Sequence, residues 1–249
     1  MTTPGAPVTP YGTANPEGKK AQVTQMFDTI APTYDRLNRI ISLGIDISWR
    51  RYAARQLKRL NPRVVVDLAT GTGDFALELA KLKPERIIGI DVSEGMLNIG
   101  RDKIARRNLS PLIEMRRGDA EALPLGDNSV DAITVGFGVR NFEHLEKGLS
   151  EMLRILRPGG VAVILEPGYP TRFPLKQLFN FYFHTLLPVI GRLISADKAA
   201  YEYLPQSVSA FPAGKDFTDI CTRLGYVHVQ YTPLTFGTCA YYWLEKPRS

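Results

Sequence analysis

Cysteine and histidine are scarce in this sequence. Its 249 residues include two cysteines, Cys221 and Cys239, and three histidines, His144, His184 and His228. Two cysteines cannot build a disulfide framework, and neither has a third sulfur or a histidine pair beside it, so a zinc site is not indicated. The histidines are too dispersed to form a metal site. We therefore expect a metal-free protein in a reduced, cytoplasmic compartment.

The sequence also lacks a signal peptide and an apolar run long enough to cross a bilayer. Residues 1–18 are rich in Pro, Gly and Thr, contain no apolar segment and begin without a basic cluster. We predict that they form a disordered tail. The aromatic stretch from Arg172 to Ile194 is interrupted by Lys176, His184 and Arg192, which excludes a membrane span.

Charge of one sign is not gathered in any long block. The formal net charge is +6 and the isoelectric point is near 9.3, but the basic residues are scattered along the chain. This balance suits solvated helix faces, an anionic membrane surface or a nucleic acid. Composition alone leaves all three open.

Hydrophobic patterning predicts a single α/β domain over residues 19–249. Strand-like apolar runs alternate with helical stretches, which is typical of a mostly parallel, doubly wound sheet. A Pro-Gly-Gly turn at 158–160 ends the third helix and leads into the fifth strand. Seven strands are expected at 64–66, 87–90, 113–116, 130–135, 161–165, 226–231 and 238–244, with helices at 75–82, 94–107, 143–156 and 215–224.

Two further segments flank this core. Residues 19–60 read as two helices broken near 42–46, and they lie ahead of the first strand. Their segment from Tyr34 to Trp49 suits either ordinary helix packing or a lid that folds over the cofactor cleft. Residues 167–212 form an insertion that is helical and aromatic to Ile194, then polar and punctuated by proline. The apolar face of this insertion suits either core packing or a channel for a greasy substrate tail.

The first predicted strand ends in a glycine-rich turn, Asp67-Leu68-Ala69-Thr70-Gly71-Thr72-Gly73-Asp74. Its glycines let the backbone approach a ligand at a helix N-terminus. The turn also satisfies a loose dinucleotide fingerprint, so an NAD-binding module remains an alternative. Asp91, at the end of the second strand, is placed to accept both hydroxyls of a ribose, or else to cap the next helix, a task for which Ser93 is better suited.

The segment after the third strand discriminates between these alternatives. Gly118-Asp119-Ala120-Glu121-Ala122-Leu123-Pro124, followed by Ser129-Val130-Asp131, resembles the adenine-binding loop of class I methyltransferases, and the run 154–160 before the fifth strand resembles a further hallmark of the same class. The resemblance implies a Rossmann-like fold and S-adenosyl-L-methionine as cofactor. It also implies that the Asp119 carboxylate accepts from the adenine amine while the backbone of Ala120 contacts the ring.

A narrower resemblance spans residues 23–246. The segments that carry it are similar to the menaquinone/ubiquinone biosynthesis C-methyltransferase family; they are Tyr34-Asp35-Arg36-Leu37-Asn38 with Ser42 and Trp49, the run 154–166, Gly136-Phe137-Gly138-Val139-Arg140-Asn141, and Ala200-Tyr201-Glu202-Tyr203-Leu204-Pro205. The chain departs from the family pattern at Leu37, Asp46, Arg157 and Gly168. The resemblance implies C-methylation of a prenylated quinol, demethylmenaquinol in menaquinone biosynthesis by preference, with the benzoquinol intermediate of ubiquinone biosynthesis as the alternative.

The site residues follow from the loops and the resemblance together. Arg140 is expected to stabilise the quinol oxyanion and Asn141 to orient the same group, unless Arg140 merely pairs with Glu143 or Glu146 on the next helix. The expected cofactor-binding residues are Asp67, Gly71, Thr72, Gly73, Asp91, Asp119, Ala120 and Gly136.

A nucleic acid, another small molecule, a membrane and a second copy of the chain are the other substrates or partners to weigh. A nucleic-acid methyltransferase suits the basic balance, but the chain has no Asn-Pro-Pro-Tyr motif after the fourth strand and no appended nucleic-acid module, so no nucleic-acid partner is expected. Another small molecule remains a lower alternative. Contact with the inner face of a membrane, where prenylated quinols reside, and a homo-oligomer both stay open.

Overall fold

The computed structural model describes residues 8–12, 15–170, 173–174, 176–177 and 198–248. Within them, seven strands form one sheet in the order β3-β2-β1-β4-β5-β7-β6. Pairing is parallel from β3 to β5, and β7 runs antiparallel to both of its neighbours. The predicted doubly wound, mostly parallel sheet is confirmed. The strands are β1 (Val64–Leu68), β2 (Arg86–Asp91), β3 (Ile113–Arg117), β4 (Val130–Gly136), β5 (Leu156–Pro167), β6 (Val227–Leu234) and β7 (Cys239–Glu245).

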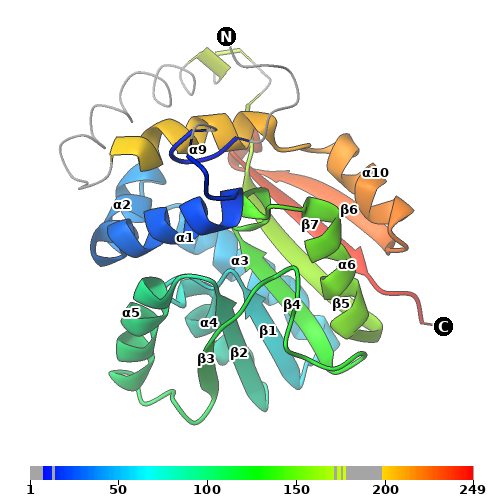
Figure 1. Ribbon diagram of the computed structural model, residues 1–249. Helices are drawn as coiled ribbons and strands as arrows, with labels where there is room; N and C mark the ends of the chain where they lie inside the picture. The colour runs from blue at the N-terminus through cyan, green and yellow to red at the C-terminus, as the bar shows by residue number, and fades with distance from the viewer. Residues whose placement is uncertain (1–7, 13–14, 171–172, 175, 178–197, 249) are drawn as a thin grey trace.

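Helices cover both faces of the sheet (Figure 1). Alternate strand residues point to opposite faces, so Val65 packs with α3, α4 and α5, whereas Val66 packs with α6 and α10. Both valines are fully buried. The covering helices are α3 (Asp46–Leu57), α4 (Asp74–Leu79), α5 (Glu94–Ala105), α6 (Leu145–Ile155) and α10 (Lys215–Arg223).

The junction between α6 and β5 differs from the prediction. The helix ends at Ile155 and β5 begins at Leu156, so the Pro-Gly-Gly sequence lies inside the strand and does not form a turn before it. Leu156 already pairs with Val130, and the register shifts between Val130 and Ala132. Pro158 favours an extended backbone in the residue before it, which explains the early start of the strand.

The N-terminal segment forms three α-helices where two were predicted, and the predicted break falls at 42–45. The helices are α1 (Lys19–Ile30), α2 (Tyr34–Ile41) and α3, with a 3-10 turn η1 (Ala31–Thr33) between the first two. The additional break comes at Pro32, which cannot donate a helical hydrogen bond.

Part of the predicted disordered tail is attached to α1. Val8 and Tyr11 pack against the apolar cluster of this helix, and the Tyr11 backbone N–H donates to Gln22 Oε1 at 2.9 Å. Gln22, which is buried, donates in turn to the Glu17 carbonyl at 2.8 Å. The tail prediction is therefore wrong for the described residues near Tyr11, because a buried glutamine supplies them with hydrogen-bond partners.

The insertion after β5 is described in part. Most of the predicted aromatic helix at 172–194 lies outside the described residues. The polar segment punctuated by proline contains helix α9 (Lys198–Ala210), with Pro205 inside it. In Figure 1, α1, α2 and α9 lie together across one edge of the sheet. Among the described residues, no helix is long and apolar enough to cross a membrane.

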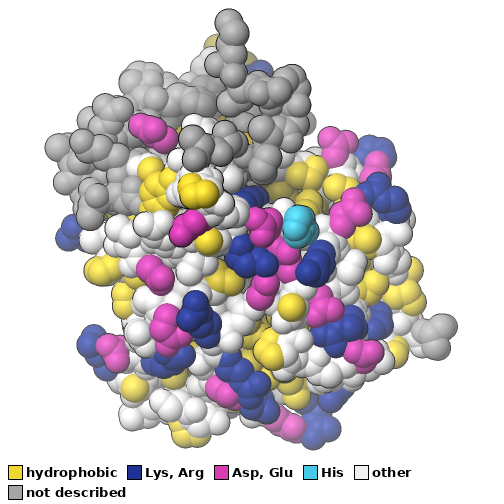
Figure 2. All heavy atoms as spheres, viewed as in Figure 1, with side chains coloured by type: hydrophobic (Ala, Val, Ile, Leu, Met, Phe, Trp, Pro, Cys, Tyr) yellow, Lys and Arg dark blue, Asp and Glu magenta, His cyan; other side chains and the backbone are white. Residues whose placement is uncertain are grey.

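Basic and acidic side chains are interspersed over the face shown in Figure 2. Many charged side chains of the described residues are paired, for example Arg154 with Asp127 at 2.6 Å and Arg223 with Glu146 at 2.5 Å. On this face the positive net charge is therefore distributed over solvated helices and loops. A concentrated basic stripe of the kind that follows a nucleic-acid backbone is not seen on it.

Candidate active site

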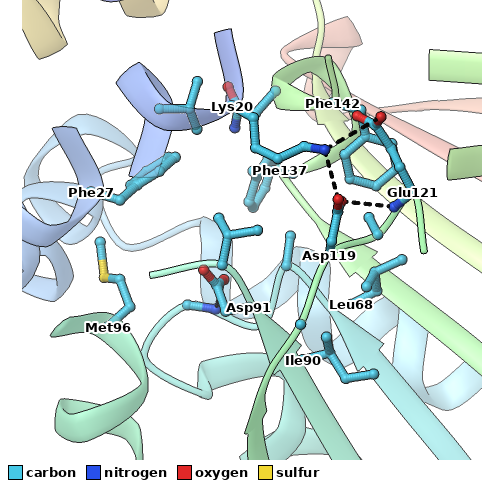
Figure 3. A pocket seen from close by; sticks show the side chains of 18 of the residues that line it. Lys20, Phe27, Leu68, Ile90, Asp91, Met96, Asp119, Glu121, Phe137 and Phe142 are labelled. Atoms are coloured by element: carbon cyan, nitrogen blue, oxygen red, sulfur yellow. Dashed lines mark hydrogen bonds and ion pairs between the residues drawn. The ribbon is translucent and has the colours of Figure 1, made fainter. Parts of the chain in front are cut away.

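A first cavity lies at the carboxyl ends of β1, β2 and β4, beside the loop that follows β3. Gly71, Asp91, Asp119, Ala120 and Gly136 all line it, so five of the eight predicted cofactor-binding residues are brought together there. Figure 3 shows the side chains of Asp91 and Asp119 on facing walls of this space. The site is built where ligands of open α/β sheets bind, outside the carboxyl ends of the strands.

Asp91 is held in place by backbone donors. Its two carboxylate oxygens accept from Gly71 N at 2.8 Å and Ser93 N at 2.9 Å. Burial raises the pKa of Asp91, and these hydrogen bonds oppose the rise. Ser93 Oγ, which accepts from Met96 N at 3.1 Å, is the N-cap of α5. Asp91 is therefore not the helix cap, and its oxygens keep lone pairs that face the cavity.

The other predicted cofactor residues, Asp67, Thr72 and Gly73, do not line the first cavity. Asp67 is buried behind the glycine turn, where it accepts from Thr70 Oγ1 at 2.5 Å, Ala76 N at 3.1 Å and Thr134 Oγ1 at 2.7 Å. Burial raises its pKa to about 6. Asp67 thus fixes the shape of the turn, and its direct contact with the cofactor stays a prediction; with Thr72 it lines a smaller pocket that shares Gly71 and Gly136 with the first cavity.

Acidic and basic side chains meet at the far end of the first cavity (Figure 3). Lys20, from α1, donates to Asp119 Oδ2 at 2.6 Å and lies 3.6 Å from Glu121 Oε2. Glu121 is 2% exposed; its Oε1 accepts from the backbone N–H groups of Glu143 and His144, while Oε2 has no hydrogen-bond partner. An unsatisfied buried carboxylate oxygen in a cavity wall suits a ligand that donates hydrogen bonds.

A second, larger cavity of about 280 Å³ adjoins the first. Most of its wall is apolar and comes from α1, α2, α3, α9 and the loops after β4, β5 and β6. Met26, Leu37, Trp49 and Leu204 are among the side chains that line it. Four residues line both cavities, and they mark the place where the two meet; these are Phe27, Tyr34, Phe137 and Asn141.

Arg140 lines the second cavity, next to this junction. Its guanidinium pairs with Glu166 Oε2 at 3.0 Å, donates to the carbonyl of Phe137, and leaves Nε buried without a hydrogen-bond partner. The alternative prediction, that Arg140 pairs with Glu143 or Glu146, is wrong, because its partner is Glu166. Burial raises the pKa of Glu166, and the Arg140 charge opposes the rise, so the pair is a buried ion pair with a free donor edge.

Asn141 connects the loop after β4 to the insertion. Its Oδ1 accepts from the Tyr203 hydroxyl, on α9, at 3.1 Å. Burial raises the pKa of Tyr203 to about 12, so this hydroxyl stays protonated near neutral pH.

Phe137 has a positive φ of 64°. Its ring lies 6.0 Å from that of Trp49 and under the guanidinium of Arg50. A bulky residue in this conformation is strained, which is common at binding sites.

Lys19 anchors the loop from the other side. This half-buried lysine donates to the carbonyls of Arg140 at 3.0 Å and Phe142 at 2.7 Å. Burial and the nearby Arg140 charge lower the pKa of Lys19. Lys19 thus ties α1 to the turn that carries both predicted catalytic residues.

Comparison with known proteins agrees with this geometry. The model of the ubiE/COQ5 methyltransferase family matches residues 16–246. The chain belongs to this family. It is 50% identical over 248 residues to a demethylmenaquinone methyltransferase of Bacteroides fragilis, covering 99% of this chain and 100% of that one. It is 44% identical over 230 residues to a ubiquinone/menaquinone biosynthesis C-methyltransferase, UbiE, of Geotalea daltonii, covering 92% and 97%.

Solved structures support the fold. A putative S-adenosyl-L-methionine-dependent methyltransferase of Methanococcus maripaludis superposes with a TM-score of 0.58 at 20% identity, covering 96% of this chain and 99% of that one. A putative O-methyltransferase of Nostoc punctiforme gives a TM-score of 0.65 at 15% identity, covering 95% and 65%. At these identities the likeness concerns the Rossmann-like methyltransferase fold alone.

Four residues of this family member were not predicted as parts of the site. Lys19, Glu121, Glu166 and Tyr203 all contact the loop between β4 and α6. Glu166 had a signal in the sequence, because a carboxylate that follows five apolar residues of a predicted central strand needs a cation. Lys19 and Tyr203 gave none, since their partners are more than 60 residues away.

Replacement of Lys19 tests its anchoring role. We expect Lys19→Met to lower the free energy of unfolding by about 1–3 kcal/mol, because two buried carbonyls lose a charged donor. Lys20→Met is the matched control, and we expect a change below about 1 kcal/mol because the Lys20–Asp119 pair is partly exposed. Urea denaturation measures both. Equal losses in the two variants would show that Lys19 is no special anchor.

Proposed function

We propose that this protein transfers a methyl group from S-adenosyl-L-methionine to a ring carbon of a prenylated quinol. The observation that carries the proposal is the pair of adjoining cavities, one with polar acceptors and one apolar, which meet at Phe27, Tyr34, Phe137 and Asn141. A cofactor in the first cavity and a quinol in the second would place donor and acceptor side by side. Such positioning supplies much of the rate enhancement of a two-substrate reaction.

The first cavity fits an adenosyl group. Asp91 offers carboxylate lone pairs for the ribose hydroxyls. Asp119, Ala120 and Glu121 Oε2, which has an ion pair with Lys20 but no hydrogen bond, suit the adenine edge. The cavity holds about 70 Å³, and Lys20 fills its adenine end, so the partly exposed lysine turns outward when the nucleoside enters. When bound, the cofactor supplies a methyl group on a positively charged sulfur.

The second cavity fits the quinol. Its apolar wall and its enclosure by α1, α2 and α9 keep water from the ring and strengthen charge interactions inside. Most of the aromatic part of the insertion, for which a channel for a greasy substrate tail was one of two interpretations, lies outside the described residues. The proposal for tail binding therefore rests on the described wall, such as Ile41 and Leu204.

Arg140 is proposed to favour ionisation of the quinol. A phenolic hydroxyl has an unperturbed pKa near 10, so forming the oxyanion at pH 7 costs about 4 kcal/mol. The guanidinium lies in the cavity wall with Nε unpartnered, and Glu166 fixes its orientation. A charge aimed at the oxyanion lowers this cost. The adjacent ring carbon would then bond to the methyl group as the carbon–sulfur bond breaks and S-adenosylhomocysteine leaves, and loss of the proton on that ring carbon would restore the aromatic quinol. Asn141, held by Tyr203, orients the same hydroxyl.

Demethylmenaquinol is the proposed substrate and the benzoquinol of ubiquinone biosynthesis the alternative. Relatives from Bacteroides fragilis and Porphyromonas gingivalis, at 50% and 41% identity, carry the name demethylmenaquinone methyltransferase. The Geotalea and Geobacter relatives carry a name that covers both pathways. The proposed place of work is the cytoplasmic side of the membrane, a reducing compartment that suits the two buried free cysteines.

Quinone analysis in a strain that lacks the gene tests the proposed function. We expect the strain to accumulate a menaquinone lighter by one methylene group, and to regain the full mass when the intact gene is returned. Mass spectrometry of extracted lipids measures this. Unchanged quinones would contradict the proposal, whereas a desmethyl ubiquinone would select the alternative substrate.

Arg140 can be tested apart from folding. Because Arg140→Met alone leaves Glu166 buried and unpaired, we combine it with Glu166→Gln. We expect kcat at pH 7 to fall about a hundredfold with cofactor affinity nearly intact, and the loss to shrink towards pH 10, where the quinol ionises unaided. Arg223→Met, which removes a surface partner of Glu146, is the control. A pH-independent loss, or lost cofactor binding, would remove Arg140 from the chemical step.

A further inference from the structure

Three large apolar side chains protrude much further than any others in the described part of the chain. Leu43, Phe173 and Phe236 are 76%, 81% and 77% exposed. The next most exposed large apolar residues, Tyr231, Ile47 and Val227, reach only 45%, 38% and 38%. Leaving a leucine and two phenylalanines in water is unfavourable, so their common exposure calls for a partner.

These side chains come from three separate loops around the second cavity. Leu43, between α2 and α3, lines the cavity itself. Phe236 follows Thr235, another lining residue, whose hydroxyl accepts from Trp49 Nε1 at 2.8 Å. Phe173 belongs to the segment that leaves β5 through the lining residue Pro167.

The loops that carry Phe173 and Phe236 also approach each other directly. A Cβ built on Gly237 would lie 3.5 Å from the carbonyl oxygen of Tyr169 and 3.6 Å from Cα of Pro170. The segment after β5 and the turn between β6 and β7 are therefore neighbours at the carboxyl edge of the sheet. The protruding residues thus belong to one side of the molecule, around the apolar cavity.

The backbone at two of these positions is strained. Leu43 and Phe236 have positive φ angles of 52° and 58°, and Thr235 has 45°. Leucine, threonine and phenylalanine rarely adopt this conformation, in which Gly or Asn would be at ease. Strained backbone that presents apolar side chains to solvent is better explained by a binding role than by folding.

We infer that Leu43, Phe173 and Phe236 insert into the surface of an anionic lipid bilayer and hold the mouth of the second cavity against it. This rests on the proposed function, because a prenylated substrate dissolved in lipid needs a path from the bilayer into the apolar cavity. The net charge of +6 attracts the chain to anionic headgroups, and the exposed Lys176 lies three residues after Phe173. Shallow apolar insertion combined with such attraction is how proteins bind a bilayer without spanning it.

Flotation with vesicles of phosphatidylglycerol and phosphatidylethanolamine tests the inference. We expect the unmodified protein to float with the vesicles, and Phe173→Ser combined with Phe236→Ser to weaken the partition at least tenfold. The control combines Val227→Ser with Tyr231→Ser, which removes two exposed apolar side chains from β6, and we expect its partition to stay within twofold. Equal Tm values establish that both variants are folded.

Other outcomes separate this inference from the proposed function and from self-association. If the unmodified protein does not float, or if the test and control variants float alike, the bilayer is not the partner. If sedimentation without vesicles shows a dimer that only the Phe173/Phe236 variant loses, a second copy covers the surface and the inference is overturned. Methylation of a tail-less quinol in solution is measured separately, since its failure concerns the function and leaves vesicle binding unaffected.

Discussion

Ion pairs attach α2 and α3 to the side of the sheet where the cofactor is proposed to bind. Both cavities depend on this attachment. Asp46, on α3, accepts from Arg39 and Arg50, and Arg39 also reaches Asp74 at the start of α4. Lys103, on α5, bridges Asp74 and Asp35 of α2 at 2.5 and 2.7 Å. Each carboxylate thus serves two elements, and the lid is fixed as a unit.

The depth of these contacts decides their energetic weight. Asp46 is 2% exposed and Arg50 7%, so their pair is shielded from water and salt. Exposed pairs contribute about 0–1 kcal/mol, whereas removal of one partner from a buried pair costs about 3–5 kcal/mol. Asp46 stands at a position where the chain departs from its family pattern, and the structure gives it this role. Loss of Asp46 would therefore loosen α2 and α3, which form part of the wall of the second cavity.

Two buried carboxylates hold the loops that border the site in the same way. Asp67, in β1, reaches Thr134 in β4 and the glycine turn, and Glu166, at the end of β5, holds Arg140. Burial raises the pKa of both carboxyl groups, and the hydrogen-bond donors and cations around them oppose the rise. These interactions fix the two turns between which the cavities meet.

Much of this arrangement could be predicted from the sequence, because its signals are local. Strand alternation gave the sheet, and the loops after β1, β2 and β3 gave Gly71, Asp91 and Asp119. The pattern could not show that Asp67 also braces the glycine turn, because its partners Ala76 and Thr134 come from α4 and β4. The partner of Arg140 was missed because pairing between strands joins residues far apart in the chain.

The structure also explains a departure from the family pattern that the sequence left unexplained. A Cβ on Gly168 would collide with the carbonyl oxygen of Gly237, so a larger residue would not fit there without a shift of the backbone. The close approach of two backbone segments is a property of the tertiary fold, and no local sequence motif predicts it. The glycine therefore reflects how the end of β5 packs against the β6–β7 turn.

A crystal structure with S-adenosylhomocysteine and a short-tailed menaquinol analogue tests the central claim most directly. We expect the homocysteine sulfur and the quinol ring to approach each other in the space bounded by Phe27, Tyr34, Phe137 and Asn141. A ring oxygen should then lie within hydrogen-bond distance of Arg140. A ring bound outside the second cavity, or a hydroxyl directed away from Arg140, would contradict it.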